Sequence, residues 1–418
     1  MVRSTVSVME GSMAVAQAVK ACRPAVISAY PITPQTHIIE DLAAMVAKGE
    51  LEAEYIRADS EFSAASILAG ASAAGVRTYT ASASQGLLLM TDVLYYLAGA
   101  RLPVVFTGTN RQVSVPLGLQ PDHRDTMSFR DAGLIQLYVE NVQEAYDTHI
   151  QAFKIAEDPQ VLLPIMVCMD GFTLTHVVEP VRILDPSEVD GFLPPYAPVH
   201  YLSLEKPAVF GSYTDETNTL ELYYLLQRAV LNAKAKIETA ALEYRDAFGH
   251  YHGSLVDGYE VDDAEVILVA LGSVVGTLRE AVDMLRAEGV KVGLIKVRSF
   301  RPFPGDEIRR LASGAGVLAV FDRAISFGNQ GVLATDVKSA LYGLPSQAQP
   351  LVLGTAAGFG GRDVTLETVR EIVTTARRAL ETGSPPPDEV QFVGLKQELL
   401  PDPEFFPNPG SNPGGYQG

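Results

Sequence analysis

The chain has 418 residues, of which 47% are hydrophobic, and a formal net charge of −18 at pH 7. This length predicts two domains, each with enough apolar side chains for a core. The acidic balance argues against nucleic acid and anionic membranes as partners, because phosphate groups are bound by basic surfaces. We also expect no membrane span and no signal peptide, since no sustained apolar run is present.

Only two cysteines occur, Cys22 and Cys168. An iron–sulfur cluster normally takes four thiolates, and a structural zinc site would need several histidines beside two thiols. We therefore expect two reduced thiols in the core, consistent with a cytoplasmic enzyme. If the protein takes part in redox chemistry, its electron carriers belong to other chains.

Residues 1–180 alternate β-rich segments with helical patterns. Nearly continuous apolar strands between helices are typical of a doubly wound, mostly parallel α/β sheet that is covered on both faces. With the long helix predicted at about 216–248, this pattern places a first domain over residues 1–250. The predicted strands are 26–30, 76–82, 102–109, 134–140 and 163–170, and the helices between them are 35–47, 59–74, 85–98 and 142–157.

Residues 181–215 interrupt this alternation with Pro, Asp and Tyr, and predict an irregular excursion within the first domain. A second, smaller α/β domain is predicted over residues 260–382. Residues 383–418 are rich in Pro and Gly and cannot build a core, which predicts an extended or disordered arm. The segments that define the second domain are a strand–turn–helix at 265–278, strands at 290–297 and 317–322, and a helix at 363–382.

A first candidate site is the segment AYPITPQT (29–36). Pro31 and Pro34 fix the backbone at the end of a strand, which is where open α/β sheets bind ligands. Thr33 lies between them. Its hydroxyl can contact a ligand or act as an ordinary turn or helix-cap group, and the local pattern alone favours the cap.

A second candidate is Glu61, which begins a helix of Ala, Ser, Gly and aliphatic residues. Close packing of such a helix would leave Glu61 in a largely uncharged setting, suited to proton exchange with a ring nitrogen. A first-turn carboxylate stabilised by the helix dipole is an alternative of equal weight. The segment SASQG (82–86) then predicts a second strand-to-helix turn, with hydroxyls, an amide and a glycine able to approach a ligand.

A third candidate is Arg111, which follows an apolar strand and has Arg101 and Asp122 as its nearest charged neighbours in sequence. A planar guanidinium can bind both oxygens of a carboxylate, so Arg111 is predicted to anchor an acidic substrate. An ion pair with Asp122 or Asp125 is an alternative of equal weight. The contiguous segment DHRD (122–125) favours a self-satisfied polar loop over a metal site.

Four blocks, in this order, resemble the α-type subunit of the pyruvate:ferredoxin oxidoreductase (2-oxoacid:acceptor oxidoreductase) family. The resemblance covers roughly residues 10–382, and YPITP together with SQG is its most specific part. It implies a pyrimidine-type thiamine-diphosphate-binding domain followed by a transketolase-C-terminal-like domain. The blocks are YPITPQT (30–36), SEFSAASILAGASAAGVRTYTASASQGLLLM (60–90), NRQVSVPLGLQPDHRDTMSFRDAG (110–133) and VRSFRPFP (297–304).

The resemblance implies that thiamine diphosphate is shared between subunits. Glu61 would contact N1′ of the aminopyrimidine and drive its imino tautomer, Arg111 would hold the substrate carboxylate, and Thr33 would hydrogen-bond the substrate. The further cofactor-binding residues expected are Pro31, Ser84 and Gln85. A β-type subunit would hold the diphosphate and Mg²⁺, a ferredoxin-like subunit would carry iron–sulfur clusters, and a γ-type subunit would complete the assembly.

The implied reaction is oxidative decarboxylation of a 2-oxo acid, with coenzyme A accepting the acyl group. The substrate is pyruvate or, because PLGLQPD (116–122) replaces the bulkier residues of pyruvate-type relatives, a larger acid such as phenylglyoxylate. Two other functions stay open. The YPITP block argues against a lipoamide-dependent thiamine enzyme, and the joint presence of Thr33, Glu61 and Arg111 argues against a non-catalytic assembly subunit.

Overall fold

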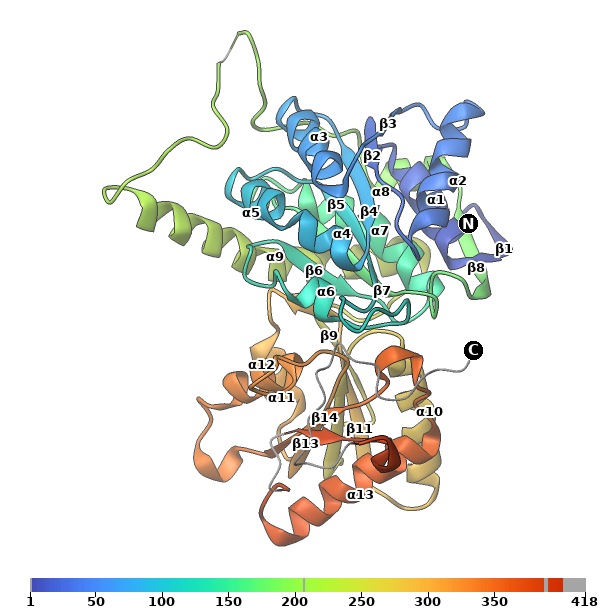
Figure 1. Cartoon of the computed structure of the whole chain (residues 1–418), viewed down its shortest axis with the longest axis vertical. Coiled ribbons are helices and arrows are strands. Elements are labelled where there is room, and N and C mark those ends of the chain that lie inside the picture. Colours follow the sequence, from blue (N-terminus) through green and yellow to red (C-terminus); the bar gives the residue numbers. More distant parts are fainter. Residues whose placement is uncertain (1, 206, 387–389, 401–418) are drawn as a thin grey trace.

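The computed structural model describes residues 2–205, 207–386 and 390–400. Two α/β units lie one above the other along the long axis of the molecule, the N-terminal unit in blue to green and the C-terminal unit in orange to red (Figure 1). Each is built around its own sheet, of seven and six strands respectively. In these ranges no helix is both long and apolar enough to cross a membrane.

The first sheet has the strand order β12-β6-β7-β5-β4-β2-β3 and is parallel except for β12. The five strands predicted within residues 26–170 are all present. The structure adds β3, a half-exposed edge strand with charged ends, and β12, a three-residue strand from the second half of the chain. The strands are β2 (Val26–Ala29), β3 (Glu54–Arg57), β4 (Thr78–Ser82), β5 (Val105–Asn110), β6 (Ile135–Tyr138), β7 (Ile165–Asp170) and β12 (Ser299–Arg301).

Helices cover both faces of this sheet, and successive strand residues belong to different cores. Val105 packs in a cluster with residues of α1, α2, α7 and α9, whereas Phe106 packs with residues of α3 and α5. Both faces of the central strands are buried, although β4 and β5 place polar side chains such as Thr80 and Thr107 among the apolar ones, and the predicted doubly wound fold is confirmed. The helices are α1 (Gly11–Cys22), α2 (Thr36–Ala47), α3 (Glu61–Ala73), α4 (Ser84–Leu89), α5 (Thr91–Gly99), α6 (Arg124–Met127), α7 (Val142–Ala156) and α9 (Thr219–Phe248).

Residues 181–215 differ in part from the irregular excursion expected there. Strand β8 (Val178–Leu184) pairs antiparallel with β1 (Ser4–Glu10), and the short helix α8 (Pro186–Phe192) follows. The pairing was hidden in the sequence because the partner strand lies at the other end of the unit. The described residues between 193 and 218 contain no further helix or strand, and α9 then projects beyond the sheet (Figure 1).

The second sheet has the order β15-β14-β13-β10-β11-β9, with β9 antiparallel to its neighbour. Strand β15 lies within the expected C-terminal arm, and its backbone pairs with the sheet edge at β14, so the arm begins with a short ordered segment. Residues 401–418 of that arm lie outside the described residues. The elements are β9 (Val256–Tyr259), β10 (Val266–Ala270), α10 (Val274–Ala287), β11 (Val292–Val297), α11 (Gly305–Leu311), β13 (Val317–Asp322), α12 (Val332–Leu341), β14 (Leu351–Ala356), α13 (Leu366–Thr382) and β15 (Gln391–Phe392).

A buried carboxylate, Asp170 at the end of β7, joins the two units. It accepts hydrogen bonds from His123 Nε2 at 2.6 Å, the Ser273 backbone N–H at 2.9 Å and Arg323 Nη1 at 2.8 Å. Burial by itself would raise the pKa of Asp170, but the charges of His123 and Arg323 hold it well below its ordinary value. Asp170 therefore stays ionised and fastens β7 to α10 and to the end of β13.

Candidate active site

The residues singled out in the sequence lie where the parallel strands of the first sheet end, at their carboxyl-terminal side. Thr33 follows β2, Ser84 and Gln85 follow β4, and Arg111 follows β5 directly. Glu61 begins α3, which follows β3. The carboxyl ends of parallel strands share an edge, and open α/β sheets bind ligands there. Sheet order thus brings together turns that are separated in the sequence.

Arg111 is nearly buried, with 7% of its surface exposed, and it connects two of these turns. Its Nη1 donates to the Thr33 carbonyl oxygen at 2.6 Å, and its Nη2 donates to Gln85 Oε1 at 3.1 Å. These bonds use two of the five N–H donors of the guanidinium, and the buried Nε has no partner in the described chain. Burial lowers the pKa of Arg111, and the charge of Asp125 opposes this effect. Within the described chain the guanidinium forms no ion pair with Asp122 or Asp125, so that alternative is wrong.

The Glu61 carboxylate has no hydrogen-bond or ion-pair partner in the described part of the chain, although only 8% of the residue is exposed. The first turn of α3 is capped instead by Ser60, whose side chain accepts from the Ser63 amide. Glu61 does lie in that first turn, so the helix dipole also acts on it. A carboxylate that is this buried normally requires a hydrogen-bond partner. The Glu61 carboxylate can therefore accept a hydrogen bond from a ligand.

Gly86 makes room for Glu61. A Cβ atom added at Gly86 would lie 2.6 Å from Glu61 Oε1 and 2.5 Å from Ser82 Oγ. Such distances are far below van der Waals contact, so any side chain at this position would displace the Glu61 and Ser82 side chains. The sequence suggested that this glycine lets a ligand approach, whereas in the structure it lets the Glu61 side chain approach. The turn after β4 thereby positions the carboxylate.

Asp125 is a site residue that the sequence did not reveal. One of its oxygens accepts from the backbone N–H groups of Ser84 (3.0 Å) and Arg111 (2.9 Å), and the other accepts from Asn110 Nδ2 (2.9 Å). Burial raises the pKa of Asp125 to about 7, although these hydrogen bonds favour its ionised form. Asp125 therefore ties the turn after β4 to the turn after β5. In the sequence it was one of four contiguous polar residues, with no sign that it is buried.

The rest of that segment is satisfied in different ways. Arg124 Nη2 lies 2.6 Å from Asp122 Oδ2, so these two neighbours do pair within the loop as expected. His123 and Asp125 instead bind partners from other elements. In the described residues the segment contributes to no group of converging metal-ligand side chains, and it is self-satisfied only through the Asp122–Arg124 pair.

Ser84 occupies a conformation that non-glycine residues rarely adopt, with φ at +49°. It is fully buried, and its hydroxyl oxygen lies 2.5 Å from both Gln85 Oε1 and the Gln112 carbonyl oxygen. Strained residues of this kind are held by the surrounding structure and concentrate at functional sites. Ser84 supports the turn, and Gln85 supplies the side chain that contacts Arg111.

Thr33 is exposed and is not the cap of the following helix. The N-cap of α2 is Gln35, so the helix-cap interpretation of Thr33 is wrong. The helix begins next to Gln35, as the local pattern indicated, after a tight turn at residues 33–35. Pro31 is also exposed and lines a cavity of about 600 Å³ with Tyr55 and residues of α2, a cavity whose wall does not include Thr33.

The loop between Arg111 and Asp122 is closed at its base, where the Gln112 N–H donates to the Gln120 carbonyl oxygen at 3.1 Å. Gly118 is packed against the Gln112 side chain, since a Cβ there would lie 1.5 Å from Gln112 Oε1. Gln120 lies against Gly361 of the second unit. The predicted role of residues 116–121 in substrate selection stays a prediction, and Gln120 is a better position than Gly118 for testing it.

Two family models match the chain. Residues 17–241 match the thiamine-diphosphate-binding domain of pyruvate flavodoxin/ferredoxin oxidoreductase, and residues 264–369 match core domain II of pyruvate:ferredoxin oxidoreductase. Among its relatives, the pyruvate synthase subunit PorA of Methanosarcina barkeri is 48% identical, over 95% of this chain and 98% of the relative. PorA of Pyrococcus abyssi is 46% identical, over 94% and 99%. The ketoisovalerate oxidoreductase subunit VorA of Pyrococcus abyssi is 41% identical, over 93% and 98%.

Solved structures share the fold at low sequence identity. A 2-oxoglutarate:ferredoxin oxidoreductase from Magnetococcus marinus superposes with a TM-score of 0.64 at 19% identity, over 88% of this chain and 65% of that one. A split-gene transketolase superposes with a TM-score of 0.52 at 13% identity, over 90% of this chain and 99% of that one. The family models and the relatives together confirm the resemblance: the chain belongs to the pyruvate:ferredoxin oxidoreductase family, as a subunit of the PorA and VorA type.

Proposed function

We propose that the chain is the α-type subunit of a thiamine-diphosphate-dependent 2-oxoacid:ferredoxin oxidoreductase, which converts a 2-oxo acid and coenzyme A into acyl-CoA and CO₂. The observation that carries this proposal is the carboxylate of Glu61, which is nearly buried yet has no partner within the described chain. It lies at the ligand-binding edge of a domain whose family binds thiamine diphosphate.

The residues present fit this cofactor. When bound, thiamine diphosphate supplies the carbon nucleophile that attacks the 2-oxo carbonyl and stabilises the charge left by the departing CO₂. Glu61 would accept a hydrogen bond from the aminopyrimidine at N1′ and exchange its proton there. Gly86 and the buried turn at Ser84 would keep the Glu61 carboxylate in place, and Pro31 and Gln85 would complete the cofactor contacts.

Arg111 and Thr33 would bind the substrate. The guanidinium is already oriented by Thr33 and Gln85, so its remaining donors can hold a carboxylate with little loss of conformational entropy. The Thr33 hydroxyl is exposed at the same edge and can donate to the substrate beside it. Asp125 holds the backbone of both turns, and so acts on the substrate only through Arg111.

The chain would need partner subunits. Its two cysteines are buried and free, and two thiols cannot ligate an iron–sulfur cluster. We assign the diphosphate and Mg²⁺ to a β-type subunit and the clusters to a ferredoxin-like subunit, with a γ-type subunit completing a cytoplasmic complex. Pyruvate is the substrate that we favour, since the PorA relatives are 48% and 46% identical. The VorA relative, at 41%, makes 2-oxoisovalerate the second candidate.

The proposal is tested by replacing Glu61 with glutamine in the co-expressed complex. A neutral amide cannot exchange the proton, so turnover of pyruvate with coenzyme A and a viologen dye should fall about 10²–10⁴-fold. The exposed carboxylate Glu54 provides the matched control, and Glu54→Gln should leave the rate unchanged. The isolated chain should show no turnover. Near-normal activity of an assembled Glu61→Gln complex would leave Glu61 with the helix-dipole role alone.

A further inference from the structure

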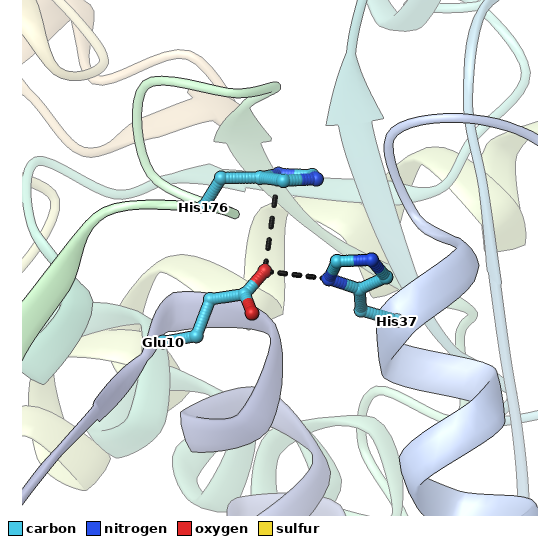
Figure 2. A group of neighbouring side chains, drawn as sticks. All are labelled: Glu10, His37 and His176. Atoms are coloured by element: carbon cyan, nitrogen blue, oxygen red, sulfur yellow. Dashed lines mark hydrogen bonds and ion pairs between the residues drawn. The ribbon is translucent and has the colours of Figure 1, made fainter.

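A cluster of two histidines and a glutamate lies outside the candidate active site. Glu10 is at the end of β1, His37 is in the first turn of α2, and His176 is in the loop after β7. Figure 2 shows the Glu10 carboxylate pointing between the two imidazole rings. Glu10 Oε1 lies 2.7 Å from His37 Nδ1 and 4.0 Å from His176 Nδ1, and the ring centroids are 4.8 Å apart.

The rings are oriented by their surroundings. Phe172 stacks on His176 with centroids 4.5 Å apart, and Thr175 Oγ1 hydrogen-bonds His176 Nδ1 at 2.7 Å. In the described chain Glu10 makes ion pairs only with the two histidines and with no lysine or arginine. Asp41, one helical turn after His37, adds further negative charge close enough to interact with both Glu10 and His37. The cluster therefore has an excess of negative charge.

A second group of similar composition differs in this respect. Asp147 accepts hydrogen bonds from His250 Nδ1 (2.9 Å), His252 Nε2 (2.7 Å), the Tyr244 hydroxyl (2.7 Å) and Gln143 Nε2 (3.1 Å). Both of its oxygens are satisfied by donors, and the side chain is buried. That group is a structural network that connects α7 to the segment after α9.

We propose that Glu10, His37 and His176 form a binding site for a divalent transition-metal ion such as Zn²⁺. Two imidazoles and one carboxylate are a common set of three protein ligands for zinc, with water in the fourth position, and imidazole disfavours Mg²⁺ and Ca²⁺. Bonds of about 2.0–2.1 Å in a tetrahedron place the ligand atoms about 3.4 Å apart.

The three candidate ligand atoms already lie within 4.8 Å of one another. The distance from Glu10 Oε1 to His37 Nδ1 must increase from 2.7 Å by roughly 0.7 Å. The distance from Glu10 Oε1 to His176 Nδ1 must decrease from 4.0 Å by roughly 0.6 Å. The three side chains are between 29% and 47% exposed, so they can change rotamer and an ion can reach them from solvent. The ion replaces the hydrogen bond between Glu10 Oε1 and His37 Nδ1, and His176 Nδ1 exchanges its hydrogen bond with Thr175 Oγ1 for the ion.

The bound ion would brace the turn that carries Thr33. A Cβ added at Gly171, in the loop that leads to His176, would lie 2.6 Å from Pro34 Cγ, so that loop packs directly on the turn. His37 lies in the first turn of α2, three residues after Pro34. An ion held by both segments fixes the turn from two sides, without taking part in the reaction.

The test measures metal binding to the full chain after treatment with a chelator. Calorimetric titration with Zn²⁺ should show one ion per chain, and Co²⁺ should give the visible absorption of a four-coordinate site. Glu10→Gln, His37→Gln and His176→Gln should each weaken Zn²⁺ binding at least about tenfold, because loss of a direct ligand costs no less than loss of an outer partner. The control His200→Gln, which removes an exposed histidine elsewhere, should bind as wild type does.

Melting curves without metal show whether each variant folds. Because the three side chains are partly exposed, the variants should unfold close to the wild-type temperature. Absence of saturable Zn²⁺ binding by the wild-type chain would overturn the proposal. Binding that persists in both His37→Gln and His176→Gln, or that is lost instead in His252→Gln, would do the same by placing the ion elsewhere.

Discussion

Replacing Arg111 with lysine separates recognition of the substrate carboxylate from recognition of its side chain. The guanidinium is held by the Thr33 carbonyl oxygen at 2.6 Å and by Gln85 Oε1 at 3.1 Å. A lysine ammonium is a point donor that cannot keep both contacts and also offer two parallel hydrogen bonds to a carboxylate. Loss of one charge-assisted hydrogen bond costs about 1.5–3 kcal/mol, or roughly 10–150-fold in kcat/KM.

That loss should be the same for every 2-oxo acid, because all of them share the carboxylate. The assay is kcat/KM of the co-expressed complex for pyruvate, 2-oxoisovalerate and phenylglyoxylate. Arg101→Lys is the matched control, since Arg101 also binds backbone carbonyl oxygens, those of Val161 and Leu162, but away from the site. This control should lower stability and leave kcat/KM unchanged. A loss confined to one substrate, or none at all, would refute the assignment of Arg111.

Three further predictions follow from contacts of single residues. Gly86→Ala should reduce kcat in an assembled complex, because the added Cβ would lie 2.6 Å from Glu61 Oε1 and displace the carboxylate; normal kcat would show that the carboxylate has room to move. The lowered pKa of Asp170 stabilises the fold above its unfolded pKa of about 3.9, and this contribution is lost as the pH falls toward the folded value. Asp170→Asn should therefore lower Tm at neutral pH, with a difference from wild type that shrinks in acid; a difference independent of pH would contradict the linkage. Gln120→Trp should lower kcat/KM for phenylglyoxylate more than for pyruvate, and a uniform loss would exclude this loop from substrate selection.

Several features of the site could be predicted from local sequence. The strand at β5 and the isolated Arg111 after it predict a ligand-binding strand end, because the nearest charges in sequence are ten or more residues away. Glu61 was recognised for a similar reason, as a carboxylate at the start of a helix of small residues. The proline pair around Thr33 marked the third turn. Each of these signals depends on residues that are close together in the chain.

The sequence by itself therefore determined the α/β class and the family, and it predicted the side chains that would carry the expected chemistry. Only the tertiary structure decided how they are supported. Asp125 is buried between two turns. The missing side chain of Gly86 leaves space that Glu61 occupies. Glu10 contacts His37 because β1 ends beside α2. Such contacts depend on the order of strands in the sheet and on which polar groups lose water, and neither is encoded in the spacing of neighbouring residues. The cap expected at Thr33 was wrong because residues 33–35 form a turn and Gln35, rather than Thr33, is the N-cap of α2.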